Sequence, residues 1–384
     1  MTICLLGRQP KLGLAELEAV FGAEHIHPVG DIACEVDDEV DLSRFGGLLK
    51  VAKHLTTLET IEFPKLISYV RKTIPDHLQY IPEGKIKLGL SFYGYELGLP
   101  KLNAANLSVK KTIKQAGRSV RVVPNIELAL STAQVMHNQL TSPVGIEFLF
   151  VRDGSKTILA QTTAVQNIED YKLRDLGRPK RDAFVGMLPP KLAQTMLNLA
   201  QAKPGTIVFD PFCGTGVVLQ EAALLGAHIY GSDLMQRMVD YSEANLDWLR
   251  HTYDLNFDST LETADATSHR WETPFDSVVS ETYLGQPMSN LPPPEKLRSI
   301  IAGCDDLHHA FFKNLAPQLK SGTRLCIALP AWRTPKGFLH LSTLDDLENL
   351  GYNRVDFVNA TQQDLIYHRE DQIVARELLI LTRK

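Results

Sequence analysis

The sequence predicts an α/β protein whose two halves are built differently. From residue 206 onward, short apolar segments alternate with longer segments whose apolar residues recur at helical spacing. This alternation is typical of a mostly parallel, doubly wound sheet. Before residue 166 the predicted strands and helices are short and less regular, which favours an α+β region. A strand that runs directly into a glycine turn, at residues 208–216, indicates where the second half binds a ligand.

Residues 1–60 are expected to form an N-terminal α+β region. A strand is predicted at 2–6, a helix at 14–21 and a second strand at 32–36. The segment 48–58 is compatible with either a helix or a strand, because its apolar residues fit both periods.

Residues 61–165 are expected to form a second small module, and residues 166–186 a linker. The module's predicted elements are a helix at 64–74, a strand at 85–93, a helix at 107–117, a strand at 120–123, a helix at 131–140 and a hairpin of 147–151 with 157–162. Both segments carry basic residues that suit phosphate contacts. A solvated helix face and an exposed polar linker are the simpler explanations. The basic residues are Lys110, Lys111, Lys114, Arg118 and Arg121 in the module, and Lys172, Arg174, Arg178, Lys180 and Arg181 in the linker.

Residues 187–384 are expected to form one domain around a seven-stranded sheet. A helix begins at Leu188-Pro189-Pro190, because proline is tolerated in a first turn. The last two strands follow each other with no helix between them and should therefore pair antiparallel. The strands are predicted at 206–210, 229–233, 261–264, 277–280, 324–328, 354–357 and 377–381, with helices near 215–225, 236–251, 295–316 and 342–350.

The glycine turn suits a ligand that has a cationic centre. Asp210 ends the first strand, Gly214 and Gly216 form the turn, and Asp233 ends the next strand. The carboxyl ends of parallel strands share one edge of a sheet, so the two acids should lie close together. No Gly-Lys-Ser/Thr follows, and the third glycine of a dinucleotide fingerprint is missing. An acid before the glycines would repel a pyrophosphate, whereas S-adenosylmethionine carries a sulfonium.

The segment 210–216, Asp-Pro-Phe-Cys-Gly-Thr-Gly, resembles the cofactor loop of class I methyltransferases that modify amino groups of nucleic-acid bases. The run from Asp170 to Ala193 is similar to THUMP-domain tRNA guanosine N2-methyltransferases. This resemblance implies a Rossmann-like methyltransferase domain, a THUMP-like RNA-binding module at 61–165, S-adenosylmethionine as cofactor and tRNA as partner. It favours RNA contacts for the two basic clusters. The implied product is N2-methylguanosine, at position 10 or in the acceptor stem.

The resemblance also implies a set of cofactor-binding residues. Asp210 would face the methionine end of the cofactor, Asp233 the ribose hydroxyls and Asp265 the adenine amino group. Helix capping or turn closure is the alternative for Asp233 and Asp265. The full set is Leu188, Pro189, Asp210, Phe212, Cys213, Gly214, Thr215, Gly216, Asp233, Leu234, Asp265 and Ala266.

The catalytic strand end departs from the family pattern. That pattern is Asp/Asn-Pro-Pro-Phe/Tyr, in which an acceptor holds the exocyclic amine and the aromatic ring stacks on the base. Here the segment 280–283 reads Ser-Glu-Thr-Tyr. Tyr283 is kept, Ser280 stands in the place of the acid and Glu281 follows it. We favour Ser280 as the residue that faces the amine, because a one-residue shift along a strand turns a side chain to the other face.

Composition sets further bounds. The net charge is −5, so nucleic-acid binding must rely on local basic patches. The five cysteines form no Cys-x-x-Cys pair, so no metal site is expected. The same pattern favours a reducing, cytoplasmic setting. No leader or membrane-spanning run is expected either. Two alternatives remain, namely a DNA adenine or cytosine amino-methyltransferase, and a catalytically silent RNA-binding subunit with a methyltransferase fold.

Overall fold

A computed structural model describes residues 1–182, 187–272, 274–286, 288, 290–370 and 372–384. The chain forms two compact units. Unit 1 comprises Met1–Leu14, Glu24–Ser43 and Gly47–Ile168, and unit 2 comprises Ala15–Ala23, Arg44–Gly46 and Glu169–Lys384. Helix α1 (Pro10–Phe21) therefore begins in unit 1 and ends in unit 2.

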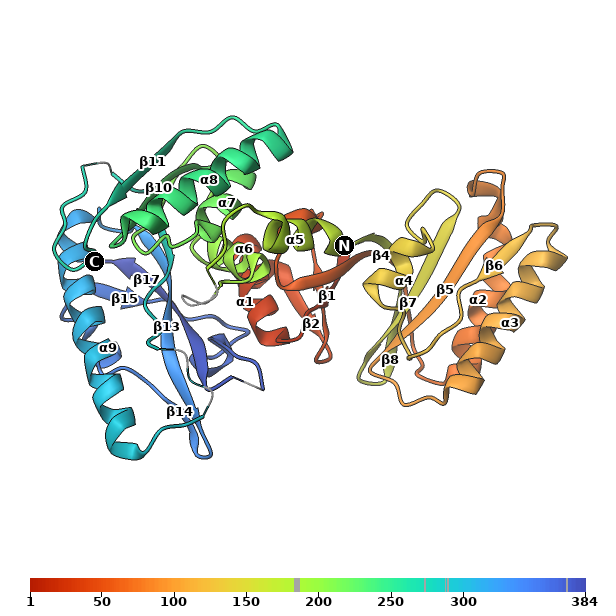
Figure 1. Ribbon diagram of the computed structural model, residues 1–384. Helices are drawn as coiled ribbons and strands as arrows, with labels where there is room; N and C mark the ends of the chain where they lie inside the picture. The colour runs from red at the N-terminus through yellow and green to blue at the C-terminus, as the bar shows by residue number, and fades with distance from the viewer. Residues whose placement is uncertain (183–186, 273, 287, 289, 371) are drawn as a thin grey trace. The chain divides into compact units, whose positions relative to one another are not determined.

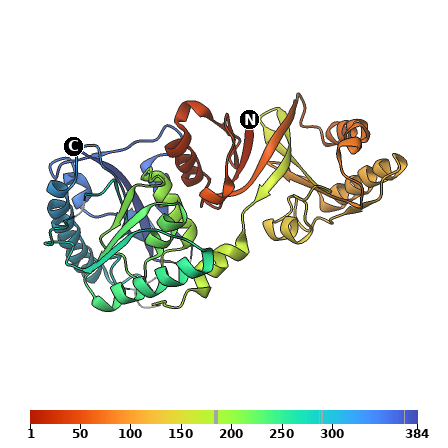
Figure 2. The same cartoon turned by 90° about the horizontal axis from the view of Figure 1, so that it is seen from above.

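Unit 1 is built on one eight-stranded sheet with the strand order β2-β3-β1-β4-β8-β7-β5-β6. The long strand β4 settles the ambiguity at 48–58, and it pairs antiparallel with β8 (Figure 2). The sheet thus continues on both sides of the expected boundary at residue 60. The strands are β1 Thr2–Leu6, β2 Ile26–Val29, β3 Ala33–Val36, β4 Leu48–Leu58, β5 Ile86–Tyr93, β6 Val120–Val122, β7 Gly145–Asp153 and β8 Lys156–Val165.

Helices α2 (Phe63–His77) and α3 (Leu99–Gln115) lie side by side and pack against β5 and β7 (Figure 1). Helix α3 starts eight residues before its predicted start, because Pro100 occupies a first-turn position where its missing N–H costs nothing. Helix α4 (Thr132–His137) is shorter than predicted and begins with a capping box between Ser131 and Gln134. Short 3₁₀ helices lie at Ala23–His25, Leu42–Arg44 and Leu78–Tyr80.

Unit 2 confirms the predicted Rossmann-like sheet. Its strand order is β11-β10-β9-β12-β13-β17-β15, with β14 paired to β13 and β16 to β17. The strands from β11 to β13 run parallel, and β17 is antiparallel to both β13 and β15. The strands are β9 Ile207–Asp210, β10 His228–Asp233, β11 Ser259–Thr263, β12 Ser277–Glu281, β13 Arg324–Thr334, β14 Gly337–Leu339, β15 Tyr352–Arg354, β16 Ile366–Tyr367 and β17 Val374–Arg383.

Helices cover both faces of this sheet (Figure 1). Helices α7 and α8 pack on β9, β10 and β11, whereas α9 contributes Leu297, Phe311 and Phe312 to the core on the other face. The helices are α5 Ile168–Lys172, α6 Pro190–Leu199, α7 Val217–Leu224, α8 Gln236–Tyr253, α9 Pro294–Leu315 and α10 Thr343–Asp346, with a π-helix at Leu173–Gly177 and 3₁₀ helices at Ala316–Gln318 and Gln362–Leu365. The expected exposed linker is therefore helical from 168 to 177.

Candidate cofactor and substrate site

The glycine turn after β9 is shaped so that only glycine fits at two positions. Gly214 has φ 52° and Gly216 has φ 78°, both in the left-handed region that L side chains rarely adopt. A Cβ on Gly216 would also lie 2.9 Å from Ser242 Oγ. The turn thus brings backbone N–H groups and the start of α7 to the edge of the sheet, an arrangement that can receive a bound molecule.

Asp233 holds this turn from the neighbouring strand. It ends β10, where its Oδ2 accepts from Gly214 N at 3.0 Å and its Oδ1 from Met235 N at 2.9 Å. Each carboxylate oxygen has two lone pairs, so both can accept a further hydrogen bond from a ligand hydroxyl. The following Leu234 is 70% exposed, which makes it available to cover a ligand.

Asp210 is a buried acid in the centre of this edge. Its Oδ1 accepts from Ser280 Oγ at 2.6 Å and from Phe212 N at 3.1 Å. Burial raises the pKa of Asp210 from 3.8 to about 7, against the lowering effect of these hydrogen bonds, and the charges of Asp233 and Glu281 raise it further. A cation placed here would favour the ionised form.

Ser280 and Glu281, at the end of β12, point to different partners. Ser280 is fully buried, and its hydroxyl donates to Asp210. The Glu281 carboxylate accepts from Arg376 Nε on β17 and retains 13% side-chain exposure. Tyr283 is 45% exposed, so its ring is open to a stacking partner.

The remaining predicted cofactor residues are distributed around the same edge. Asp265 is exposed, and its Oδ1 accepts from the backbone N–H and the hydroxyl of Thr267. It therefore closes a turn, which is the alternative role that the sequence suggested for it. The Ala264 N–H donates to Asp233 O at 2.9 Å, which keeps the end of β11 beside Asp233. Leu188, Cys213, Thr215 and Ala266 are buried, while Pro189 and Phe212 are half-buried.

Some of the basic residues are exposed, whereas others are buried or bonded to groups within the protein. Arg118 donates to the carbonyl oxygens of Leu78, Ile81 and Pro82 and so holds a helix end. Arg174 forms a buried ion pair with Glu221 and Asp170, and Arg178 is only 3% exposed. Neither Arg174 nor Arg178 belongs to an exposed basic surface, which corrects their assignment to phosphate contacts. Lys111, Lys114, Arg121, Lys172, Lys180 and Arg181 are exposed, and Lys110 is half-buried.

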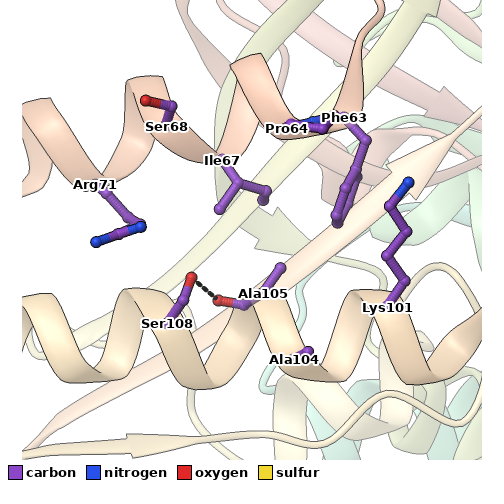
Figure 3. A pocket seen from close by; sticks show the side chains of 9 residues that line it. All are labelled: Phe63, Pro64, Ile67, Ser68, Arg71, Lys101, Ala104, Ala105 and Ser108. Atoms are coloured by element: carbon purple, nitrogen blue, oxygen red, sulfur yellow. Dashed lines mark hydrogen bonds between the residues drawn. The ribbon is translucent and has the colours of Figure 1, made fainter.

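Sequence reasoning missed Arg376 and a groove on unit 1. Figure 3 shows this groove between α2 and α3, with a volume of about 330 Å³. Arg71 and Lys101 line it, and the Lys101 ammonium lies 5.2 Å from the centre of the Phe63 ring. The other lining residues are Pro64, Ile67, Ser68, Ala104, Ala105 and Ser108.

Two features are absent from the residues that the structure describes. In that part of the chain, no group of three or more His, Cys, Asp or Glu could hold a metal ion. Among the helices drawn from the same residues, none combines the length and the apolar character needed to cross a membrane.

The fold and the strand-end site define a class I methyltransferase domain. Residues 178–357 match the family model UPF0020, described as an RMKL-like methyltransferase domain. This match and the curated relatives described next confirm the resemblance seen at residues 170–216.

Curated relatives match parts of the chain. A tRNA (guanine(10)-N2)-dimethyltransferase of Methanothermobacter thermautotrophicus is 31% identical over 177 residues, which are 45% of this chain and 47% of that protein. A tRNA (guanine(6)-N2)-methyltransferase of Thermus thermophilus is 40% identical over 76 residues, 18% of this chain and 23% of that protein. The chain thus spans about half or less of the length of these relatives.

Solved structures extend the similarity of the fold to the whole chain. TrmN from Thermus thermophilus matches with a TM-score of 0.54 and 16% identity, over 100% of this chain and 99% of that one. A possible methylase from Clostridium difficile matches with a TM-score of 0.50 and 14% identity, over 100% and 98%. At such identities the match shows the fold alone.

Proposed function

We propose that the chain is an S-adenosylmethionine-dependent tRNA methyltransferase that forms N2-methylguanosine, at position 10 or in the acceptor stem. The observation that carries the proposal is the buried acid Asp210 beside a left-handed glycine turn, with Asp233 on the next strand, in a domain of this family. The names of the relatives support tRNA guanine as the substrate. The exposed lysines and arginines of unit 1 support binding to RNA phosphates.

The residues present fit S-adenosylmethionine. A buried acid whose pKa lies near 7 is stabilised by a neighbouring cation, and Gly216 leaves space where a Cβ would clash. When bound, the cofactor supplies a methyl group activated by a positively charged sulfur. Asp233 would accept from the ribose hydroxyls and Asp210 would face the methionine end. Asp265 would accept from the adenine amino group, and the glycine turn would let the backbone approach closely.

For catalysis, we propose that Glu281 accepts a hydrogen bond from the guanine N2 amine and takes up its proton after methyl transfer. Its partial exposure, its negative charge and the fixed position given by Arg376 support this assignment over Ser280. Ser280 is fully buried and donates to Asp210, so it positions that acid. Tyr283 would stack on the extruded base, an interaction that contributes about 1–3 kcal/mol.

The test is incubation of the full chain with an unmodified tRNA transcript and methyl-labelled cofactor, followed by nucleoside analysis. We expect label in N2-methylguanosine and none in duplex DNA supplied in parallel. Label in adenine or cytosine of the DNA would replace the proposal with a DNA amino-methyltransferase. Binding of both cofactor and tRNA with no methyl transfer would leave the silent RNA-binding subunit, a reading that the missing prolines at 281 and 282 favour.

The same proposal includes a cytoplasmic location, where tRNA is modified. The described cysteines are all free and buried, which fits a reducing compartment.

A further inference from the structure

Arg178 is a buried charged side chain whose guanidinium lacks hydrogen-bond acceptors. Its side chain is 3% exposed, and its Nε and both terminal nitrogens have no hydrogen-bond partner in the described part of the chain. A guanidinium stays protonated in proteins and offers five N–H donors. Leaving such a group buried without an acceptor is costly, so this arrangement needs an explanation.

The nearby carboxylates do not supply the missing acceptor. Glu221 is directed to Arg174, with Oε1 at 2.7 Å from Nε and Oε2 at 3.4 Å from a terminal nitrogen. Asp175 acts on Arg178 through its charge, and no hydrogen bond joins them. Burial lowers the pKa of Arg178 more than these acids raise it. The N–H donors of the guanidinium therefore remain without an acceptor from these carboxylates.

The segment that carries Arg178 is fixed to the glycine turn. Asn245 of α8 donates to Lys180 O at 2.9 Å and to Thr215 O at 2.8 Å, and it accepts from Lys180 N at 2.9 Å. Farther along, Arg237 pairs with Asp182 at 2.8 Å. One asparagine thus joins the backbone two residues after Arg178 to the turn from which α7 starts.

We propose that Arg178 binds the carboxylate of the amino-acid end of S-adenosylmethionine. This inference rests on the proposed function and adds a subsite to it. Asp210 would bind the positively charged part of that molecule and Asp233 its ribose hydroxyls. The carboxylate is then the one charged group that still lacks a partner. An arginine fork can bind a carboxylate through two parallel hydrogen bonds. An exposure of only 3% at Arg178 favours a small carboxylate over a backbone phosphate of a folded RNA.

The first test compares two ligands that differ only in this carboxylate, S-adenosylmethionine and decarboxylated S-adenosylmethionine. Calorimetry on the full wild-type chain should show about 10- to 100-fold tighter binding of the carboxylated form. Arg178→Met should lose that preference and bind the decarboxylated form within about twofold of wild type. Arg178→Lys, which keeps the charge but not the fork, should retain part of it. Arg298→Met, an exposed arginine on α9, is the matched control and should behave as wild type.

A second readout separates ligand binding from a structural role. Because Arg178→Met removes a buried guanidinium that lacks hydrogen-bond acceptors, the ligand-free variant should melt at or above the wild-type temperature, and S-adenosylmethionine should raise its Tm less. A lower ligand-free Tm with equal loss of affinity for both ligands would show that Arg178 is structural and overturn the inference. A wild-type chain that binds both ligands equally would also overturn it, while leaving the proposed function in place. A wild-type chain that binds neither would remove the proposed function itself.

Discussion

At the scale of single residues, the most informative group is Asp210, whose ionisation should respond to the charge of the ligand. Its pKa in the folded protein is about 7, raised from 3.8 by burial. In the ligand-free state the neutral form is thus favoured below pH 7. The contribution of Asp210 to the stability of the folded protein is fully present below about pH 4, and it is lost as the pH rises through 7. A sulfonium beside Asp210 reverses that preference.

We therefore predict that affinity for S-adenosylmethionine rises between pH 5 and 7, by up to about tenfold per pH unit, and levels off above pH 7. S-adenosylhomocysteine has the same amino and carboxyl groups but a neutral sulfur, so its affinity should change much less. Asp210→Asn should abolish the difference between the two pH profiles, as measured by calorimetry. Parallel profiles for both ligands in the wild-type protein would place the sulfonium away from Asp210.

The two strand-end residues of β12 are expected to differ in their kinetic effects. Glu281→Gln should lower kcat on tRNA by about 10²- to 10⁴-fold, the range for loss of a general base. Cofactor affinity should barely change. Ser280→Ala removes the hydrogen bond that lowers the pKa of Asp210, so it should shift the pH profile of cofactor binding upward while kcat falls less. The reverse ranking in kcat would restore Ser280 as the residue that faces the amine.

At the scale of elements, the strands of unit 2 could be predicted because each is short, apolar and bounded by turn residues. Six of the seven predicted segments largely coincide with strands, whereas 354–357 shares only Arg354 with β15, and β14 and β16 were not predicted. The start of α3 could not be predicted, because Pro100 looks like a helix breaker unless it is known to occupy the first turn. Strand β4 was ambiguous because the apolar residues of 48–58 fit both a helical and a strand period.

The contacts within the site were less accessible to sequence reasoning. Ser280 and Asp210 are 70 positions apart, and Arg376 lies 95 positions beyond Glu281. Their meeting depends on the order of strands in the sheet, which periodicity does not give. Likewise, Arg174 and Arg178 look like exposed linker residues until the burial of the π-helical segment is known.

Strand β4 carries a buried ion pair that permits a stability test. Lys50 Nζ lies 2.6 Å from Glu147 Oε1 on β7, and Glu147 also accepts from Ser91 and Thr162. Lys50→Met should destabilise unit 1 by about 3–5 kcal/mol, because it leaves the Glu147 charge buried and unpaired. Lys53→Met, at an exposed position on the same strand, should change stability by less than about 0.5 kcal/mol.

The measurement must report on unit 1 itself. Trp248, Trp271 and Trp332 all belong to unit 2, so tryptophan fluorescence would follow the wrong unit. Hydrogen exchange of the β4 and β8 amides is suitable. Adding Glu147→Leu to Lys50→Met should restore part of the lost protection. Unchanged exchange in Lys50→Met would mean that the pair contributes little to folding.

At the scale of the whole molecule, a net charge of −5 has to be reconciled with the polyanionic substrate that we propose. Such a protein binds RNA through local basic surfaces, and each phosphate neutralised releases counterions. In unit 1 we propose that such a surface is formed on α3 and β6 by the exposed Lys111, Lys114 and Arg121, with the half-buried Lys110. Phosphate contacts position the RNA without reading its sequence.

The double variant Lys110→Glu/Lys114→Glu should therefore weaken binding to many tRNAs alike. The slope of log Kobs against log salt should become shallower by about 2, one for each lost phosphate contact. Lys320→Glu/Lys336→Glu changes the net charge equally at exposed positions of unit 2 that have no assigned contact, and it should leave that slope nearly unchanged. Filter binding of several tRNA transcripts over a range of salt concentrations measures both quantities. Equal losses in the two double variants would mean that net charge alone governs binding. A loss confined to one tRNA would mean that these lysines read sequence or shape instead of phosphate.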